Sequence, residues 1–327
     1  LNTDHGEWVR DYDQVRENAE VPPEACILVI SADGKGIPMT RQDSPPPEAR
    51  RGRGQNKTAK KESTITASYA IAPYPRTSDD IIQALVPDSN SSDTPKKVRP
   101  TPVDKQLFGT LQGQEAAFDH LVEQVSRREH SQVRHRVALT DGNRGLKKRV
   151  QQHFPHFTLI IDIIHVTEYL WEVANTLLGE THAMRDTWMR DALRCVLDDD
   201  LDRLLDHLDY QFLRVSSKKQ AIVKKVRRYL RNNRQHMDYQ SYLAHGYPIG
   251  TGVIEGACRH LVKDRFEQAG MRWSKLGAQV MLDLRATFLN GDWDDFQRFR
   301  RHQAHQQRYS SSHPDIIPED IMMSVAA

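Results

Sequence analysis

The sequence of 327 residues contains only three cysteines, Cys26, Cys195 and Cys258, and none belongs to a C-x-x-C pair. This scarcity excludes a disulfide framework and a zinc site built on cysteine pairs. No apolar run approaches the roughly 18–20 residues that a membrane-spanning helix needs, and no charged and then apolar start resembles a signal peptide. We therefore expect a soluble cytoplasmic protein with no membrane partner.

Net charge is also nearly absent, because 46 Lys and Arg stand against 44 Asp and Glu and leave a formal charge of +2. Local clusters of charge therefore say more about partners than the total does. Hydrophobic residues make up 38% of the chain, which is too many for a disordered protein. The length allows one elaborate domain or two ordinary ones.

Apolar runs predict five strands with helices between the later ones. Residues 27–30 are typical of a strand buried on both faces, and residues 64–72 alternate as a half-buried strand does. The other predicted elements are strands at 36–40, 137–139 and 157–161 and helices at 112–128 and 143–152. The order β-β-β-α-β-α-β favours an α/β fold with a mixed sheet, antiparallel first and parallel later, as in the ribonuclease H-like fold.

The composition also divides the chain into sections. Leu, Trp, Tyr and Ala recur at spacings of three and four after the fifth strand, which indicates helices only. The Pro-rich segments 43–63 and 87–104 are expected to be exposed connections. The expected sections are a lead-in helix or linker at 1–24, the first part of the core at 25–165, an all-helical section at 166–246, the completion of the core at 247–303, and a polar tail at 304–327.

Two of the predicted strands end in the dipeptide Asp-Gly, at Asp33-Gly34 and Asp141-Gly142. If the two strands lie side by side and parallel, both carboxylates emerge at one edge of the sheet. Carboxylates that close repel each other unless a cation lies between them, and Mg²⁺ prefers such hard oxygen ligands. Asp-Gly is also a common turn dipeptide, so turn chemistry remains open for each pair.

A third carboxylate is expected from a helix that crosses this edge. Glu255 follows a flexible glycine-containing entry in which Thr251 is a possible N-cap. Arg259 and Lys263 follow Glu255 at i+4 and i+8, on the same face of a regular helix. A carboxylate and two bases on one face can hold metal and phosphate together, although an ordinary Glu-Arg pair has the same spacing.

Four blocks of the sequence carry a more specific pattern. Three contain the acids, at 30–36 (ISADGKG), 138–143 (ALTDGN) and 248–259 (PIGTGVIEGACR), and the last continues through 260–274. The fourth is 162–166 (DIIHV). In this order the blocks resemble bacterial insertion-sequence DDE transposases of the ISKra type, whose D-x-x-H element is shared with Mutator-like transposases.

The resemblance implies that Asp33, Asp141 and Glu255 form a catalytic triad of carboxylates that hold Mg²⁺ or Mn²⁺, with two ions expected. It further implies that the all-helical section is an insertion and that the enzyme cuts and joins DNA during transposition. The partners would be element ends and target DNA in the bacterial nucleoid, with self-association on DNA. Asp162 and His165 would brace the site or contact the DNA backbone, unless they only bond to the local backbone.

Basic residues near the acidic blocks are expected to neutralise DNA phosphates. An aromatic residue among them has two interpretations, because Trp273 either stacks on an unpaired base near the cut or is a core tryptophan. The expected DNA-binding residues are Arg144, Lys147, Lys148, Arg259, Lys263, Arg272 and Trp273.

Two other functions remain open. Relatives of the ISKra type usually carry an additional N-terminal DNA-binding region, and little precedes the first predicted strand here. The chain could therefore be a truncated transposon remnant that binds DNA or a partner without catalysis. It could also be a ribonuclease H-like nuclease that cuts without strand transfer.

Overall fold

The computed structural model describes residues 4–17, 19–43, 60–87, 98–128, 132–268 and 270–309. In this part of the chain, five strands form one sheet in the order β3-β2-β1-β4-β5. The pairs β1–β2 and β2–β3 are antiparallel, whereas β1–β4 and β4–β5 are parallel. The strands are β1 (Ile27–Pro38), β2 (Lys60–Ile71), β3 (Val103–Thr110), β4 (His135–Thr140) and β5 (Thr158–Ile161).

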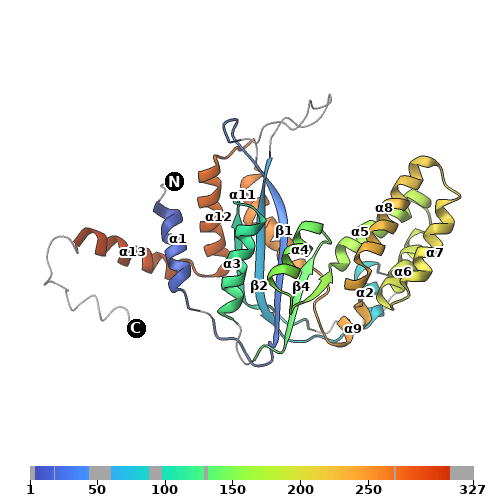
Figure 1. Cartoon of the computed structure of the whole chain (residues 1–327), viewed down its shortest axis with the longest axis horizontal. Helices are drawn as coiled ribbons and strands as arrows, with labels where there is room; N and C mark the ends of the chain where they lie inside the picture. The colour runs from blue at the N-terminus through green and yellow to red at the C-terminus, as the bar shows by residue number, and fades with distance from the viewer. Residues whose placement is uncertain are drawn as a thin grey trace.

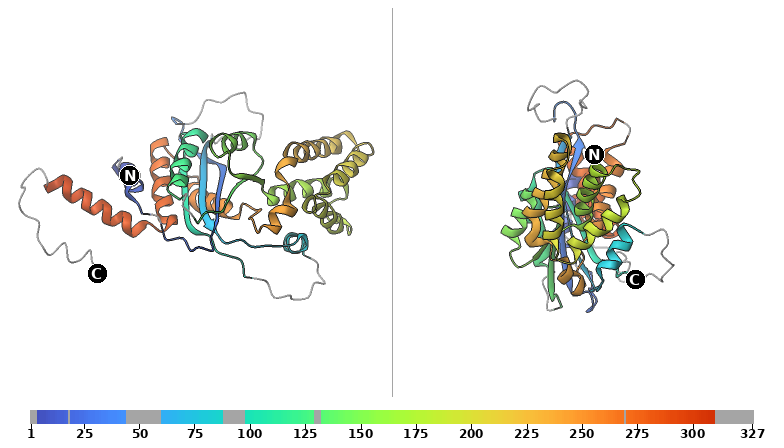
Figure 2. Two further views of the ribbon diagram at one scale, coloured as in Figure 1. Left: turned by 60° about the horizontal axis from the view of Figure 1, so that its bottom comes forward. Right: turned by 90° about the vertical axis from the view of Figure 1, so that its right-hand side faces the viewer.

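Helices flank the sheet on both faces (Figures 1 and 2). In Figure 1, α1, α12 and α13 lie toward the edge of the sheet that β3 forms, and α5 to α9 lie toward the opposite edge. The helices are α1 (Asp4–Val15), α2 (Ser78–Leu85), α3 (Gln114–Ser126), α4 (Arg144–His153), α5 (Ile163–Leu177), α6 (Arg185–Leu197), α7 (Leu201–Phe212), α8 (Ser217–Asn233), the 3₁₀-helix η1 (Arg234–His236), α9 (Tyr239–Ala244), α10 (Gly252–Ala257), the π-helix η2 (Cys258–Lys263), α11 (Asp264–Phe266), α12 (Lys275–Asn290) and α13 (Trp293–Tyr309).

The alternation of side chains along β1 assigns each face of the sheet its own core. Leu28 and Ile30 pack with residues of α3 and α4 on one face. Ile27 and Val29 pack with α5 and the helices beyond it on the other face. Successive side chains of a strand point to opposite faces, so Asp33 shares the face of Val29, which α5 and the α10–η2 segment cover.

The predicted α/β class with a five-stranded mixed sheet is confirmed, but one strand comes from another segment than predicted. Residues 36–40 do not turn back as a second strand, because β1 runs through Gly34 and Gly36 and pairs with β2 over that length. β3 occupies 103–110, where the sequence pattern predicts a connection that ends at 104 and no strand after it. A strand order of 3-2-1-4-5 is compatible with the ribonuclease H-like fold.

The outer edge of the sheet at β3 is bonded to side chains of α12. The Asn290 amide accepts a hydrogen bond from the backbone N–H of Leu107 at 2.8 Å and donates to its carbonyl at 3.1 Å. Gln279 likewise donates to the carbonyl of Gly109 at 3.0 Å and accepts from the N–H of Leu111 at 2.9 Å. Two side-chain amides therefore satisfy the backbone groups that an edge strand leaves unpaired.

Several expected sections can be compared with these elements. The lead-in section contains α1, which contacts α12 and α13. Helices α5 to α9 fill the section predicted to be all-helical. α13 continues to Tyr309, so the expected polar tail begins as helix; residues 310–327 lie outside the described part, as does most of segment 43–63. No helix in the described ranges is both long and apolar enough to cross a bilayer.

Candidate active site

Three carboxylates lie at matching positions on three neighbouring parallel strands. The β1–β4 ladder, continued two residues beyond its last pair, reaches Asp33 and Asp141. The β4–β5 ladder, continued by one residue, reaches Asp141 and Asp162. Neighbouring strands are about 4.8 Å apart, so these side chains follow one another across one face of the sheet where the parallel strands end.

Glu255 reaches this face from α10. Ligand atoms of Glu255, Asp162 and His165 lie within 4.8 Å of one another. One turn further along, the Cys258 thiol donates a hydrogen bond to Asp33 Oδ2 at 3.3 Å. Burial raises the pKa of that thiol, and the negative charges of Asp33 and Glu255 add to the effect. Among the described residues, the set of ligand atoms that all lie within 4.8 Å of one another includes neither Asp33 nor Asp141. Asp33 and Asp162 are still near enough to Asp141 to raise the pKa of its carboxyl, and we call Asp33, Asp141, Asp162 and Glu255 together the acidic cluster.

Asp162 is completely buried at the centre of this arrangement. Its Oδ1 accepts hydrogen bonds from the backbone N–H groups of Ile164, at 2.9 Å, and Thr251, at 3.2 Å. Its Oδ2 accepts from His165 Nδ1 at 2.7 Å and lies 2.5 Å from the Thr251 hydroxyl. Four donors occupy the two oxygens, so this carboxylate fixes the end of β5 against the start of α10 and has little capacity left for an ion.

Thr251 occupies the N-cap position of α10, but its side chain makes no capping hydrogen bond. The predicted N-cap position is therefore confirmed, but the hydroxyl does not cap the helix. The hydroxyl instead lies between Asp162 Oδ2 and Glu255 Oε1, at 2.5 and 3.2 Å. Because a hydroxyl has one proton and two lone pairs, it can donate to one carboxylate at a time. This contact ties the position of Glu255 to that of Asp162, and it depends on the tertiary fold.

The acidic cluster is electrostatically unfavourable without a cation. Burial raises the pKa of the Asp141 carboxyl, and the charges of Asp33 and Asp162 raise it further, against the opposing effects of the Asn143 N–H and His165. The hydrogen bond to Asp162 raises the pKa of His165 to about 9, so this imidazole is positively charged at neutral pH. One imidazolium does not balance the surrounding carboxylates, and such groups favour a bound cation.

The carboxylate oxygens of the acidic cluster are suitable ligands for a hard divalent cation. Asp33 Oδ1 accepts only the adjacent Gly34 N–H, at 2.7 Å, and Asp141 Oδ1 accepts only the Asn143 N–H, at 2.7 Å, among the described contacts. Glu255 is exposed. These carboxylates retain free lone pairs of the kind that Mg²⁺ and Mn²⁺ prefer. His165 is a poorer ligand, because its Nδ1 is bound to Asp162 and its ring is protonated.

The expected basic residues lie on two segments. Arg144, Lys147 and Lys148 belong to α4, which begins three residues after Asp141. Arg259 and Lys263 are exposed on η2. η2 is a π-helix, so the regular α-helical spacing behind the predicted common face does not apply, and the alignment of both bases with Glu255 stays a prediction. π-helical turns often occur at functional sites.

Trp273 is partly buried against the core that α12 and η2 share. The centroid of its ring lies 4.9 Å from that of Phe266. The Arg265 guanidinium lies 5.3 Å from the same Trp273 centroid. Its backbone N–H donates to the Pro38 carbonyl at 3.0 Å, and its carbonyl accepts from the Thr40 N–H at 2.9 Å. This packing favours the core interpretation of the indole over base stacking. Arg272, next to it, is exposed.

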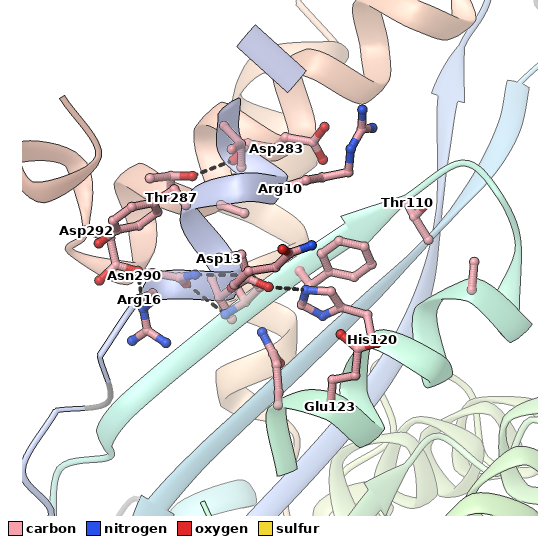
Figure 3. Close-up of a pocket in the computed structure, with 18 of the residues that line it drawn as sticks. Arg10, Asp13, Arg16, Thr110, His120, Glu123, Asp283, Thr287, Asn290 and Asp292 are labelled. Carbon is pink, nitrogen blue, oxygen red and sulfur yellow. Dashed lines mark hydrogen bonds and ion pairs between the residues drawn. The ribbon is translucent and has the colours of Figure 1, made fainter. Parts of the chain in front are cut away.

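A separate pocket of about 360 Å³ lies between α1, β3, α3 and α12. Figure 3 shows Asp13 of α1 facing His120 of α3 across it, with 2.9 Å between Asp13 Oδ2 and His120 Nε2. Arg16 reaches Asp292 at 2.8 Å on the same side. These contacts attach α1 and the residue after its end to α3 and to the turn between α12 and α13, and the pocket lies at the β3 edge, away from the acidic cluster.

Comparisons with known proteins add little to this geometry. No protein-family model matches the chain, and no curated protein matches it. Among solved structures, the Drosophila P element transposase strand transfer complex is similar at 8% identity, covering 95% of this chain and 81% of that one, with a TM-score of 0.23. A likeness at this level carries no argument, so function has to be inferred from the acidic cluster and the sequence blocks.

Proposed function

We propose that this chain is the catalytic region of a DDE transposase of the ISKra type, which cuts DNA and joins the freed end to target DNA. One observation carries the proposal. Asp33 and Asp141 occupy matching positions where adjacent parallel strands end, and Glu255, which is more than a hundred residues further along the chain, lies within 4.8 Å of the neighbouring Asp162. Turn chemistry alone gives no reason for this convergence.

In this proposal Asp33, Asp141 and Glu255 would hold the Mg²⁺, with two ions expected. Bound ions at such a site stabilise the attacking and the leaving oxygen of a phosphodiester. In the cutting step a water oxygen bonds to phosphorus and the bond to the 3′-oxygen breaks, which leaves a 3′-hydroxyl. In the joining step that hydroxyl bonds to a target phosphorus and displaces another 3′-oxygen.

The neighbouring residues supply position and charge. Asp162 holds His165 and Thr251 in place through its four hydrogen bonds, and the charged imidazole faces Asp141. We assign His165 to the DNA backbone beside the cut, since a fixed cation there offsets phosphate charge. Element ends and target DNA are the proposed partners, with self-association on DNA.

The test is cleavage of supercoiled plasmid by the purified chain in Mg²⁺, comparing the wild type with Asp33→Asn. This variant keeps the shape of the side chain and removes a charge that holds metal, so we expect nicking to fall at least a hundredfold while DNA binding changes little. Asp206→Asn is the matched control, because Asp206 is exposed on α7. Equal nicking by Asp33→Asn and wild type would remove the assignment.

The products separate the alternatives. A transposase joins a labelled 3′-hydroxyl DNA end to the target plasmid, whereas a nuclease without strand transfer gives nicked plasmid only. A remnant without catalysis binds DNA and leaves the plasmid supercoiled in both Mg²⁺ and Mn²⁺. We expect joined products that depend on Asp33, Asp141 and Glu255 alike.

A further inference from the structure

We propose that a basic cleft between α4 and α8 holds the phosphodiester backbone of the DNA strand that enters the acidic cluster. The cleft has a volume of about 490 Å³, and four cationic side chains line it: Arg144, Lys147, Lys225 and Arg228. None of its lining residues within the described chain is acidic. This inference rests on the proposed function for the identity of the strand, but the cleft itself is defined by its own residues.

The cleft begins directly beside the acidic cluster. Gly142, which follows Asp141, lines it, and the Tyr229 hydroxyl donates to the Asp141 carbonyl at 3.0 Å. Gly142 has a φ of +87°, and a Cβ there would lie 3.0 Å from the Tyr229 ring, so glycine is needed for this close packing. α8 is thereby fixed against the loop that carries Asp141, and a strand leaving the cluster along this path meets the four cations next.

The aromatic rings of the cleft already contact each other and a lysine ammonium, so they are poorly available to stack on bases. Tyr169 and Tyr229 stack on each other with centroids 4.0 Å apart and planes at 28°. The Lys225 ammonium lies 4.9 Å from the Tyr169 centroid and 2.7 Å from Glu172. Contacts of this kind hold an ammonium over a ring. The cleft therefore presents charge and not stacking faces, and charge recognises phosphate without regard to sequence.

The two arginines of the cleft can reach a ligand, because Arg144 and Arg228 are both exposed. Lys147 is more enclosed; burial lowers the pKa of its ammonium, and its Nζ donates to the Asn233 side chain. Planar guanidinium groups bind phosphate in a bidentate manner. We therefore expect Arg144 and Arg228 to make the principal phosphate contacts.

The test measures binding of a fluorescent 30-base-pair DNA duplex across a salt series, with the full chain carrying Arg144→Gln and Arg228→Gln. Each lost phosphate contact removes about 0.9 from the slope of log affinity against log salt, so the slope should fall by about 2 and Kd should rise about tenfold or more near 0.1 M salt. The matched control is Arg231→Gln, since Arg231 lies on the same helix but pairs with Asp209 of α7.

The outcomes are distinct for the cleft and for the proposed function. A slope equal to that of the Arg231→Gln control, or no DNA binding by the wild type, would overturn the cleft as a DNA site. A larger loss of affinity for an RNA duplex than for DNA would overturn DNA as the occupant. If the slope falls by about 2 in the Arg144→Gln and Arg228→Gln protein as expected, but the wild type never nicks plasmid in Mg²⁺ or Mn²⁺, the proposed function fails and the cleft remains a DNA site.

Discussion

Replacing Asp283 by Asn should make the protein more stable at neutral pH. The gain in stability should be smaller at acidic pH. Asp283 lies on α12 in the pocket of Figure 3, and only 8% of its surface is exposed. Burial raises the pKa of its carboxyl from 3.8 to about 6, although a hydrogen bond from Gln279 and the charge of Arg10 oppose the shift. Ionising this buried group therefore costs stability.

The magnitude follows from the two pKa values. The folded state binds the proton more tightly than the unfolded state, so the favourable contribution of the neutral acid is full below pH 3.8 and is lost as the pH rises through about 6. The difference between the two values corresponds to about 3 kcal/mol, at about 1.4 kcal/mol per pH unit. Asn cannot ionise and still accepts the Gln279 hydrogen bond, so it avoids this loss.

The assay is urea denaturation of wild type and Asp283→Asn between pH 5 and pH 8. Between these limits the variant should gain about 1.5 kcal/mol relative to the wild type, about half of the full effect. Any constant cost of the amide cancels in this comparison. Asp119→Asn is the control, because Asp119 lines the same pocket but is exposed. A stability difference that stays flat with pH, as in the control, would refute the reasoning.

Two further predictions concern the acidic cluster. Thr251→Val keeps the shape of the side chain but removes the hydroxyl bonded to Asp162. We therefore expect the free energy of unfolding in urea to fall by about 1–3 kcal/mol and nicking to be reduced, whereas Thr251→Ser should stay close to wild type. Equal effects of Val and Ser would contradict the role of the hydroxyl. Mg²⁺ at about 100 times its Kd should stabilise the wild type by about 2.7 kcal/mol, seen as a higher Tm, and should stabilise Asp141→Asn much less; equal shifts would place the ion elsewhere.

The sequence predicts the meeting of Asp33 and Asp141 because the rule behind it is local. Each acid follows an apolar run, and the carboxyl ends of parallel neighbours always lie at one edge of a sheet. The same rule does not reach Thr251 and Cys258, whose partners Asp162 and Asp33 are 89 and 225 residues away. The roles of these two side chains depend on the tertiary contact between α10, η2 and the sheet, and no spacing in the sequence marks it.

The strand errors have a similar cause. β3 carries Asp104, Lys105 and Gln106 and contains Gly109, so its sequence lacks the apolar alternation of a strand. It is an edge strand whose outer backbone groups bond to side chains of α12, so tertiary contacts stabilise it where local preference does not. The glycines of β1 predict a turn but lie within a long antiparallel pair. π-helical η2 is likewise outside any rule based on a period of 3.6 residues.

The amides of Asn290 and Gln279 also limit how this chain can associate with other molecules. By occupying the outward N–H and C=O groups of Leu107, the carbonyl of Gly109 and the N–H of Leu111, they block the template on which a second copy or an extended peptide would add as a sixth strand. Any assembly of two copies on a nucleic acid must then be built from helix surfaces or loops. Replacing both amides would expose that template and invite sheet-to-sheet aggregation.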